Sequence, residues 1–230
     1  MAQTEPTRLF LLVLLAVAAV ALTLIPALLL SANMQTNPTN LRRPLLNLAY
    51  TIICAGGIAA IFYPNKCRMM FQKPAAPNKE NGSATSALEL KGHHPDCENY
   101  SANRITIRNR VFCAGCGGLL IGAIVALIVV VFYSLGVLNV MEGTVWIIGV
   151  GEGLMLAGLA QIRAERYVKL AMNAFFVVGS AVMLVWADWA KQSLLVDGYV
   201  LGVILFMLWL RILLSEYNND RTCLACGHCS

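Results

Sequence analysis

Six long apolar runs constrain this chain of 230 residues more than any other feature of its sequence. A helix needs roughly 17–25 mostly apolar residues to cross the hydrocarbon core of a bilayer, which is about 30 Å thick. A helix is also the natural spanning form, because it satisfies its backbone hydrogen bonds within one segment. The predicted spans are Leu9–Leu30, Leu45–Tyr63, Gly117–Leu138, Thr144–Ile162, Leu170–Ala187 and Leu194–Leu214.

The composition agrees with a membrane protein. Hydrophobic residues make up 58% of the chain and charged residues only 13%, whereas about 25% of the residues of a typical soluble domain are charged. The predicted fold class is therefore an all-α polytopic membrane protein with about six transmembrane helices, and its first partner is the lipid bilayer. The first run could instead be a cleaved signal sequence, but it exceeds the usual apolar core of about 7–15 residues, which favours a retained helix.

Basic residues predict the orientation, because Lys and Arg concentrate in cytoplasmic loops. The segment between the second and third spans holds eight of the 17 basic residues, and Arg163, Arg166 and Lys169 lie between the fourth and fifth spans. Placing these loops in the cytoplasm puts both termini there too, with Arg42 and Arg43 as the exception. The sequence thus predicts a multi-pass protein of the cell membrane with both termini cytoplasmic. The net charge of +5 is explained by orientation, so no nucleic-acid partner is expected.

Five regions follow along the chain. Residues 1–63 hold the first two spans, and 64–91 form a Pro-, Ser- and Lys-rich segment whose composition predicts a flexible cytosolic linker. Residues 92–116 form a cytosolic Cys/His loop, 117–214 hold the remaining spans, and 215–230 form a Cys-rich tail. Within the loop, "RITIRNRVF" alternates apolar with polar side chains, which predicts a short strand or hairpin.

The loop has the ligand spacing of a zinc ribbon. His94-x-x-Cys97 is followed by fifteen residues and then by Cys113-x-x-Cys116, with His93 as an alternative nitrogen ligand. Cytosolic cysteines are kept reduced, so a cluster of them favours a metal site or catalytic thiols over disulfides. Two ligands three residues apart can bind one ion, and a hairpin can bring the second pair round to complete a tetrahedron.

The tail carries a second cluster: Cys223, Cys226, His228 and Cys229. It could share the loop site, bind a second metal ion or act as a mobile dithiol. We expect at least one tail cysteine to pack close to a loop cysteine, because the predicted topology places tail and loop on the same side of the membrane.

A redox role is the alternative for the same thiols. Cys113 and Cys116 precede an apolar run and so lie at the predicted amino end of a helix, where the helix dipole stabilises a thiolate. Disulfide exchange or an iron–sulfur cluster would use this property, and zinc binding benefits from it equally.

The stretches "HHPDC" and "VFCAGCGGLLIGAIVAL" resemble a family of small uncharacterised prokaryotic integral membrane proteins, a domain of unknown function. In that family a His and a Cys precede a Val-x-Cys-x-x-Cys-x-Gly motif that enters a transmembrane helix. The similarity covers about residues 93–122, and the residues whose importance it implies are His94, Cys97, Cys113, Cys116 and Gly118. Because the family carries no established activity, the resemblance supports the site and not a reaction.

Glu152 lies near the middle of the fourth predicted span. A charged side chain there costs on the order of 2–3 kcal/mol or more, so an intramembrane carboxylate is a functional candidate. The flanking Gly149 and Gly153 predict a close helix contact, and Asn173 is a possible partner. Asp188, between two tryptophans, is expected at the membrane interface.

The sequence favours a non-enzymatic protein: a structural, sensory or accessory component of a membrane complex with a cytosolic zinc site. Its partners would be other membrane subunits or a second copy of the chain. The alternatives are a membrane thiol oxidoreductase or iron–sulfur electron carrier, and a transporter or channel with Glu152 on its pathway. The chain has no Walker, HExxH or GxSxG motif to support ATP hydrolysis, zincin proteolysis or lipase chemistry.

Overall fold

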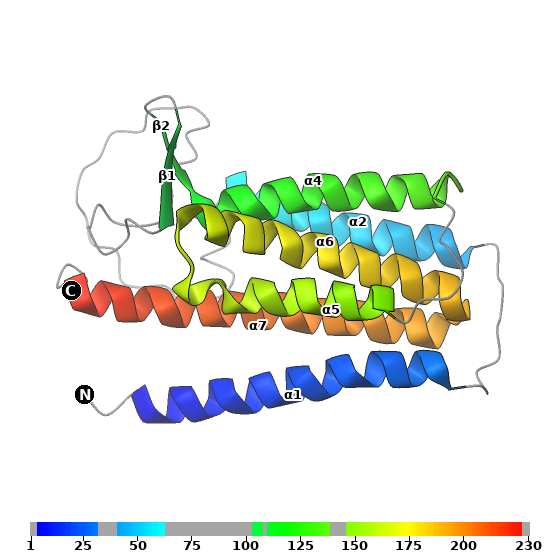
Figure 1. The fold of residues 1–230 in the computed structure, drawn as a ribbon, viewed down its shortest axis with the longest axis horizontal. Coiled ribbons are helices and arrows are strands. Elements are labelled where there is room, and N and C mark those ends of the chain that lie inside the picture. The colour runs from blue at the N-terminus through cyan, green and yellow to red at the C-terminus, as the bar shows by residue number, and fades with distance from the viewer. Residues whose placement is uncertain (1–3, 32–40, 63–102, 108–109, 139–145, 227–230) are drawn as a thin grey trace, which may run out of the picture.

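Long helices lie side by side and alternate in direction in the computed structural model of this protein (Figure 1). The structure describes residues 4–31, 41–62, 103–107, 110–138 and 146–226. The α-helices within these ranges are α1 (Thr4–Leu30), α2 (Arg42–Phe62), α4 (Ala114–Ser134), α5 (Trp146–Leu159), α6 (Arg166–Lys191) and α7 (Leu194–Cys226).

Five of these helices, α1, α2, α4, α6 and α7, are long and apolar enough to cross a membrane. The exception is α5, which has 14 residues and is followed by a 3-10 helix, Ala160–Arg163. At 1.5 Å per residue α5 is about 21 Å long, which is shorter than a bilayer core. Five of the predicted spans are thus confirmed as membrane-compatible helices, while the one expected at Thr144–Ile162 contains a shorter apolar helix. This architecture fits a multi-pass membrane protein.

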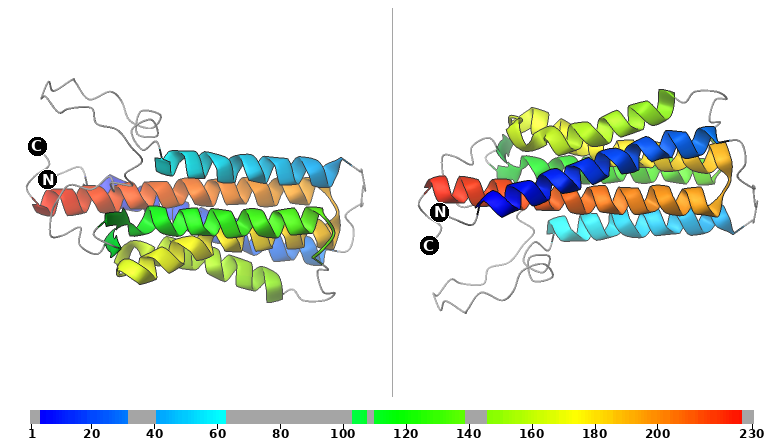
Figure 2. Two further views of the ribbon diagram at one scale, coloured as in Figure 1. Left: turned by 90° about the horizontal axis from the view of Figure 1, so that it is seen from above. Right: turned by 90° about the horizontal axis from the view of Figure 1, so that it is seen from below.

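The most buried of the long helices is α6, which lies between α4, α5 and α7 (Figure 2). Its contact with α4 depends on Gly118 and Gly122. A Cβ atom added at Gly122 would lie 2.7 Å from the carbonyl oxygen of Ala174, and one at Gly118 would lie 2.7 Å from the Cβ of Asn173. Any side chain here would separate the two helices, so these two glycines allow α4 and α6 to approach each other closely.

The contact between α5 and α6 uses other glycines than the sequence predicts. A Cβ at Gly179 would lie 2.6 Å from the carbonyl oxygen of Gly151. At Gly149 and Gly153 an added Cβ would meet nothing within 4 Å. The prediction for Gly149 and Gly153 is therefore wrong in the described structure: these residues lie on the open side of α5.

Polar contacts connect α2 to α6 and α1 to α7. The Tyr50 hydroxyl of α2 donates to the carbonyl oxygen of Val177 at 3.1 Å. Farther out, the Tyr199 hydroxyl of α7 donates to the carbonyl oxygen of Ala21 at 2.9 Å, which connects α1 to α7. Large apolar side chains remain exposed along α1, α2, α4 and α5, as expected for surfaces that contact lipid chains.

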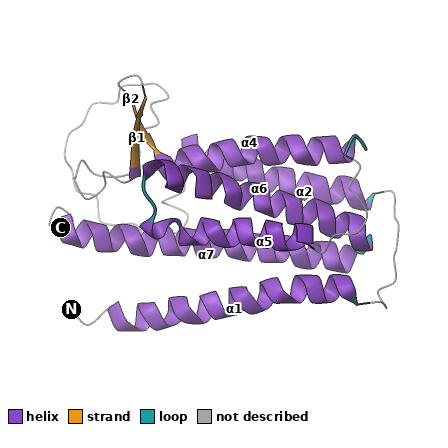
Figure 3. Ribbon diagram, in the orientation of Figure 1, coloured by secondary structure: helices purple, strands orange, loops and turns teal. Residues whose placement is uncertain are grey.

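A small hairpin precedes α4 (Figure 3). Strand β1 (Arg104–Ile107) pairs antiparallel with β2 (Arg110–Cys113), with Arg104 opposite Cys113. The Ile105 side chain is 2% exposed, so one apolar residue of the alternating pattern is buried. The hairpin predicted from the alternation is thus present, and β2 runs directly into α4.

The hairpin, the amino end of α1 and the carboxyl end of α7 lie at the same end of the bundle (Figure 1). This arrangement agrees with the prediction that the loop and the tail share one side. The tail expected from residue 215 begins as a continuation of α7, which stays helical to Cys226. The whole predicted linker, residues 64–91, and residues 92–102 of the Cys/His loop lie outside the described residues.

Candidate functional site

Two thiols lie at the amino end of α4. Cys113 is the residue that precedes the helix, with extended backbone angles of φ −74° and ψ 122°, and Cys116 is in the first helical turn. The Cys113 side chain is buried, that of Cys116 is partly buried, and neither forms a disulfide. The two side chains are joined by a hydrogen bond. The free amides of the first turn and the helix dipole favour negative charge at this position.

Two buried cations approach these thiols from other helices. Arg211 of α7 is 7% exposed and Lys169 of α6 is 9% exposed. The Arg211 guanidinium interacts electrostatically with both thiols, and the Lys169 ammonium interacts with Cys113. Helices α4, α6 and α7 thus each contribute charge or sulfur to one place.

Asparagines hold the two cations. Asn173, which is fully buried, donates from Nδ2 to the carbonyl oxygen of Lys169 at 2.6 Å. Its Oδ1 accepts hydrogen bonds from Arg211 Nε, at 3.0 Å, and from Arg211 Nη2. Lys169 Nζ donates to Asn103 Oδ1, just before the hairpin, and the Arg211 guanidinium carbon lies 5.9 Å from the centre of the Phe176 ring. We refer to Cys113, Cys116, Lys169, Asn173 and Arg211 as the thiol site.

The charge of the thiol site is unbalanced. Among the described residues, neither Lys169 nor Arg211 forms an ion pair with a carboxylate. A buried cation without an opposite charge is costly, and removing one partner of a buried pair typically costs about 3–5 kcal/mol. Lys169 and Arg211 thus favour negative charge at the two thiols, whereas burial of the thiols opposes it.

The metal site predicted from the sequence is described only in part. Cys113 and Cys116 are brought together as expected, whereas His93, His94 and Cys97 lie outside the described residues. Within the described ranges no group of three or more His, Cys, Asp or Glu side chains could hold a metal ion. The complete ligand set stays a prediction.

The tail cysteines are placed only by their backbone. Cys223 and Cys226 lie in the last turns of α7, and their side chains are not described, while His228 and Cys229 lie outside the described residues. Because α7 is helical here, Cys223 lies about 18 Å along the axis from Arg211, at 1.5 Å per residue. The sequence-based prediction assumed an extended tail, which reaches farther per residue than a helix does. Contact between the tail and the loop therefore stays a prediction.

Other polar residues differ from expectation. Glu152 Oε1 is buried and has no hydrogen-bond partner among the described residues. Its predicted partner, Asn173, is instead bound to Lys169 and Arg211. Asp188 lies near the carboxyl end of α6 and is completely buried against Arg42 and Arg43 of α2. Its expected position at the membrane interface stays a prediction.

Sequence reasoning missed Arg211 and Lys169 of the thiol site, and also Asp197 of α7, which is buried and pairs with Arg42. The cost of a charge within an apolar span, which singled out Glu152, applies equally to Arg211 and Asp197 and could have identified both. No protein-family model, curated protein or solved structure matches this chain. The family resemblance around the Cys-x-x-Cys motif accordingly stays a prediction.

Proposed function

We propose that this membrane protein binds a zinc ion through the thiolates of Cys113 and Cys116, completed by His94 and Cys97 of the preceding loop. The observation that carries the proposal is the pair of buried cations beside two adjacent thiols at a helix amino terminus. A bound zinc ion would connect the loop to the helix bundle and contribute folding energy. The protein would act as a structural, sensory or accessory component of a membrane complex.

The residues present fit a thiolate-bound metal. A Cys3His site around Zn²⁺ has a net negative charge, since three thiolates outweigh the divalent ion. Lys169 and Arg211 supply opposite charge next to the two described thiols. Because Lys169 lies on α6 and Arg211 on α7, formation of the site beside them would connect the loop to three helices.

Metal analysis of the purified full chain tests this proposal. We expect about one zinc ion per chain in the wild type and a loss of zinc in Cys113→Ser and Cys116→Ser. Cys54→Ser is the matched control, because Cys54 is a free buried thiol of α2 outside the thiol site and its replacement should leave the zinc content unchanged. Wild-type protein that contains no zinc while its thiols remain intact would contradict the proposal.

A thiol oxidoreductase is the second candidate, and it is supported by the hydrogen bond between Cys113 and Cys116. Buried cations would stabilise the reduced thiolate form, so a disulfide between these residues would be strongly oxidising, by the argument that applies to other stabilised thiolates. Zinc-free protein with a reversible disulfide would favour this candidate. An iron–sulfur cluster would instead make an anaerobic preparation coloured.

A further inference from the structure

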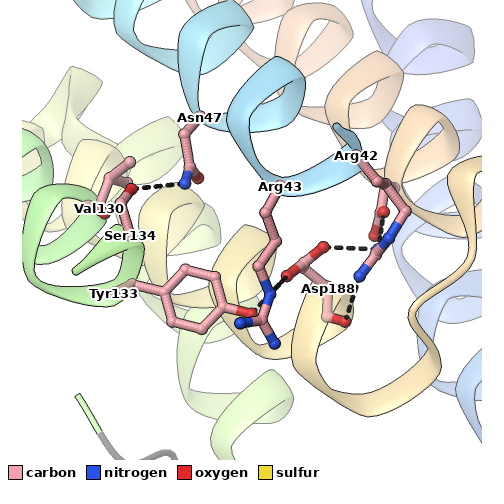
Figure 4. A network of polar contacts seen from close by, with 8 residues as sticks. Arg42, Arg43, Asn47, Val130, Tyr133, Ser134 and Asp188 are labelled. Carbon is pink, nitrogen blue, oxygen red and sulfur yellow. Dashed lines mark hydrogen bonds and ion pairs between the residues drawn. The ribbon is translucent and has the colours of Figure 1, made fainter. Parts of the chain in front are cut away.

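A second polar cluster lies at the opposite end of the bundle from the thiol site, where α2, α4, α6 and α7 meet (Figure 4). We call it the distal cluster; its members are Arg42, Arg43, Tyr133, Asp188 and Asp197. It connects the start of α2 to the turn between α6 and α7, two segments far apart in the sequence.

The two carboxyl groups of the distal cluster have unequal surroundings. Asp188 Oδ1 lies 2.5 Å from Arg42 Nη1, and Asp188 Oδ2 accepts hydrogen bonds from Arg43 Nε, at 3.3 Å, and from the Tyr133 hydroxyl. Asp197 Oδ2 accepts a hydrogen bond from Arg42 Nη1. Asp197 thus has fewer donors than Asp188.

A hydrogen-bond donor is missing between the two carboxyl groups. Asp197 Oδ1 is buried and has no hydrogen-bond partner within the described residues, and Asp188 Oδ1 has only its ion pair with Arg42 Nη1. Asp188 Oδ1 and Asp197 Oδ2 both contact Arg42 Nη1, so the two carboxyl groups are adjacent. Two ionised carboxylates at that separation repel each other strongly in a medium of low dielectric constant, whereas a single proton shared between them removes the repulsion.

The net charge of the buried residues in the distal cluster is consistent with one bound proton. Arg42, Asp188 and Asp197 are 4%, 0% and 1% exposed, whereas Arg43 is 46% exposed and lies 5.2 Å from the centre of the Tyr133 ring. If both carboxyls were ionised, the three buried groups would have a net charge of minus one, balanced only by the half-exposed Arg43, whose Nε lies 3.3 Å from Asp188 Oδ2. One added proton makes them neutral, which lowers the cost of burying them. Lys191, also on α6, is directed instead to the carbonyl oxygen of Ser31.

We propose that Asp188 and Asp197 form a proton-binding site and hold one proton between their carboxyl groups. The proton comes from water and converts a carboxylate pair of charge minus two into a pair of charge minus one. A metal cation fits this position less well, because Arg42 Nη1 contacts both carboxyl groups.

Infrared spectroscopy of the full chain in lipid nanodiscs at neutral pH tests the site. We expect a carbonyl band of a protonated carboxylic acid that shifts when the aspartate carboxyls are labelled with ¹³C. The band should be lost in Asp197→Asn, because the amide then supplies the missing donor and leaves Asp188 ionised. Glu152→Gln is the control, since it removes the other buried carboxyl with an unpartnered oxygen and should leave the label-sensitive band in place.

The labelled wild-type protein decides the question even if a variant does not fold. Absence of a label-sensitive acid band at neutral pH would overturn the proposal, as would its persistence in folded Asp197→Asn. Loss of the band on adding sodium at constant pH and ionic strength would also overturn it, because the position would then accept a metal cation.

Discussion

Arg211 is the residue that most directly sets the charge of the thiol site. It is buried, is held by Asn173 and interacts with both thiols. We expect Arg211→Met to weaken zinc binding by roughly 10–100-fold, the usual effect of losing a group that supports metal ligands. Competition with a chromophoric chelator on the purified chain measures the change.

Two further variants separate charge from packing at this residue. Arg211→Lys keeps the charge and should retain more of the zinc affinity than the methionine variant, although it loses the two hydrogen bonds to Asn173 Oδ1. Arg8→Met is the control, because Arg8 is exposed and donates to the Tyr217 hydroxyl. Equal zinc affinity in wild type and Arg211→Met would show that the cation does not act on the metal.

Local spacing predicted the two described thiols of the site but not the residues around them. Cys113 and Cys116 are close in sequence, and their place before an apolar run indicated the helix terminus. Arg211 and Lys169 reach the same place from α7 and α6, and that contact depends on how the helices pack. Helix packing in a membrane is set by side-chain shape along several faces, which spacing alone does not determine.

At the scale of helices, the contact between α4 and α6 should be intolerant of added volume. We expect Gly122→Ala to destabilise the protein by about 1–3 kcal/mol, the usual cost of overpacking. The added Cβ would lie 2.7 Å from the carbonyl oxygen and 2.9 Å from the Cα of Ala174, and backbone cannot move aside as a flexible side chain can. Thermal unfolding in detergent measures the effect.

Gly153→Ala on α5 is the matched control, because an added Cβ there meets nothing within 4 Å. Its stability should stay within about 1 kcal/mol of the wild type, and alanine is the better helix former. If both variants were equally stable, the close packing of α4 on α6 would be wrong.

The helices also show where apolar length is a sufficient signal. Apolar length predicted α1, α2, α4, α6 and α7. The reason is that backbone polar groups in lipid must form hydrogen bonds within their own segment, and a helix provides these whatever its neighbours are. Apolar length predicted the extent of α5 less well, and the small-residue spacing of Gly149 and Gly153 indicated the wrong face. A pair of glycines four residues apart permits a close contact, but whether a neighbour occupies that face depends on the arrangement of the whole bundle.

For the molecule as a whole, the distal cluster removes the main objection to the predicted orientation. Arg42 and Arg43 are basic residues on the side assigned to the exterior. In the structure both pair with buried aspartates, Arg42 with Asp188 and Asp197 and Arg43 with Asp188. These two arginines therefore have a structural role that accounts for their position. The orientation is then predicted from the basic residues that precede α4 and α6, which place that end of the bundle in the cytoplasm.

We expect both termini, the hairpin and the thiol site to face the cytoplasm. Reporter domains active only in the cytoplasm, fused in separate experiments at each terminus and inserted in the segment 139–145 between α4 and α5, measure this directly. Both terminal fusions should be active and the insertion inactive, because α4 runs from the hairpin end of the bundle to the opposite end (Figure 1). Replacing Arg42 and Arg43 by methionine should lower stability without inverting this pattern. An active insertion with inactive termini would reverse the orientation and place the thiols in an oxidising compartment, where a disulfide would become the expected state of Cys113 and Cys116.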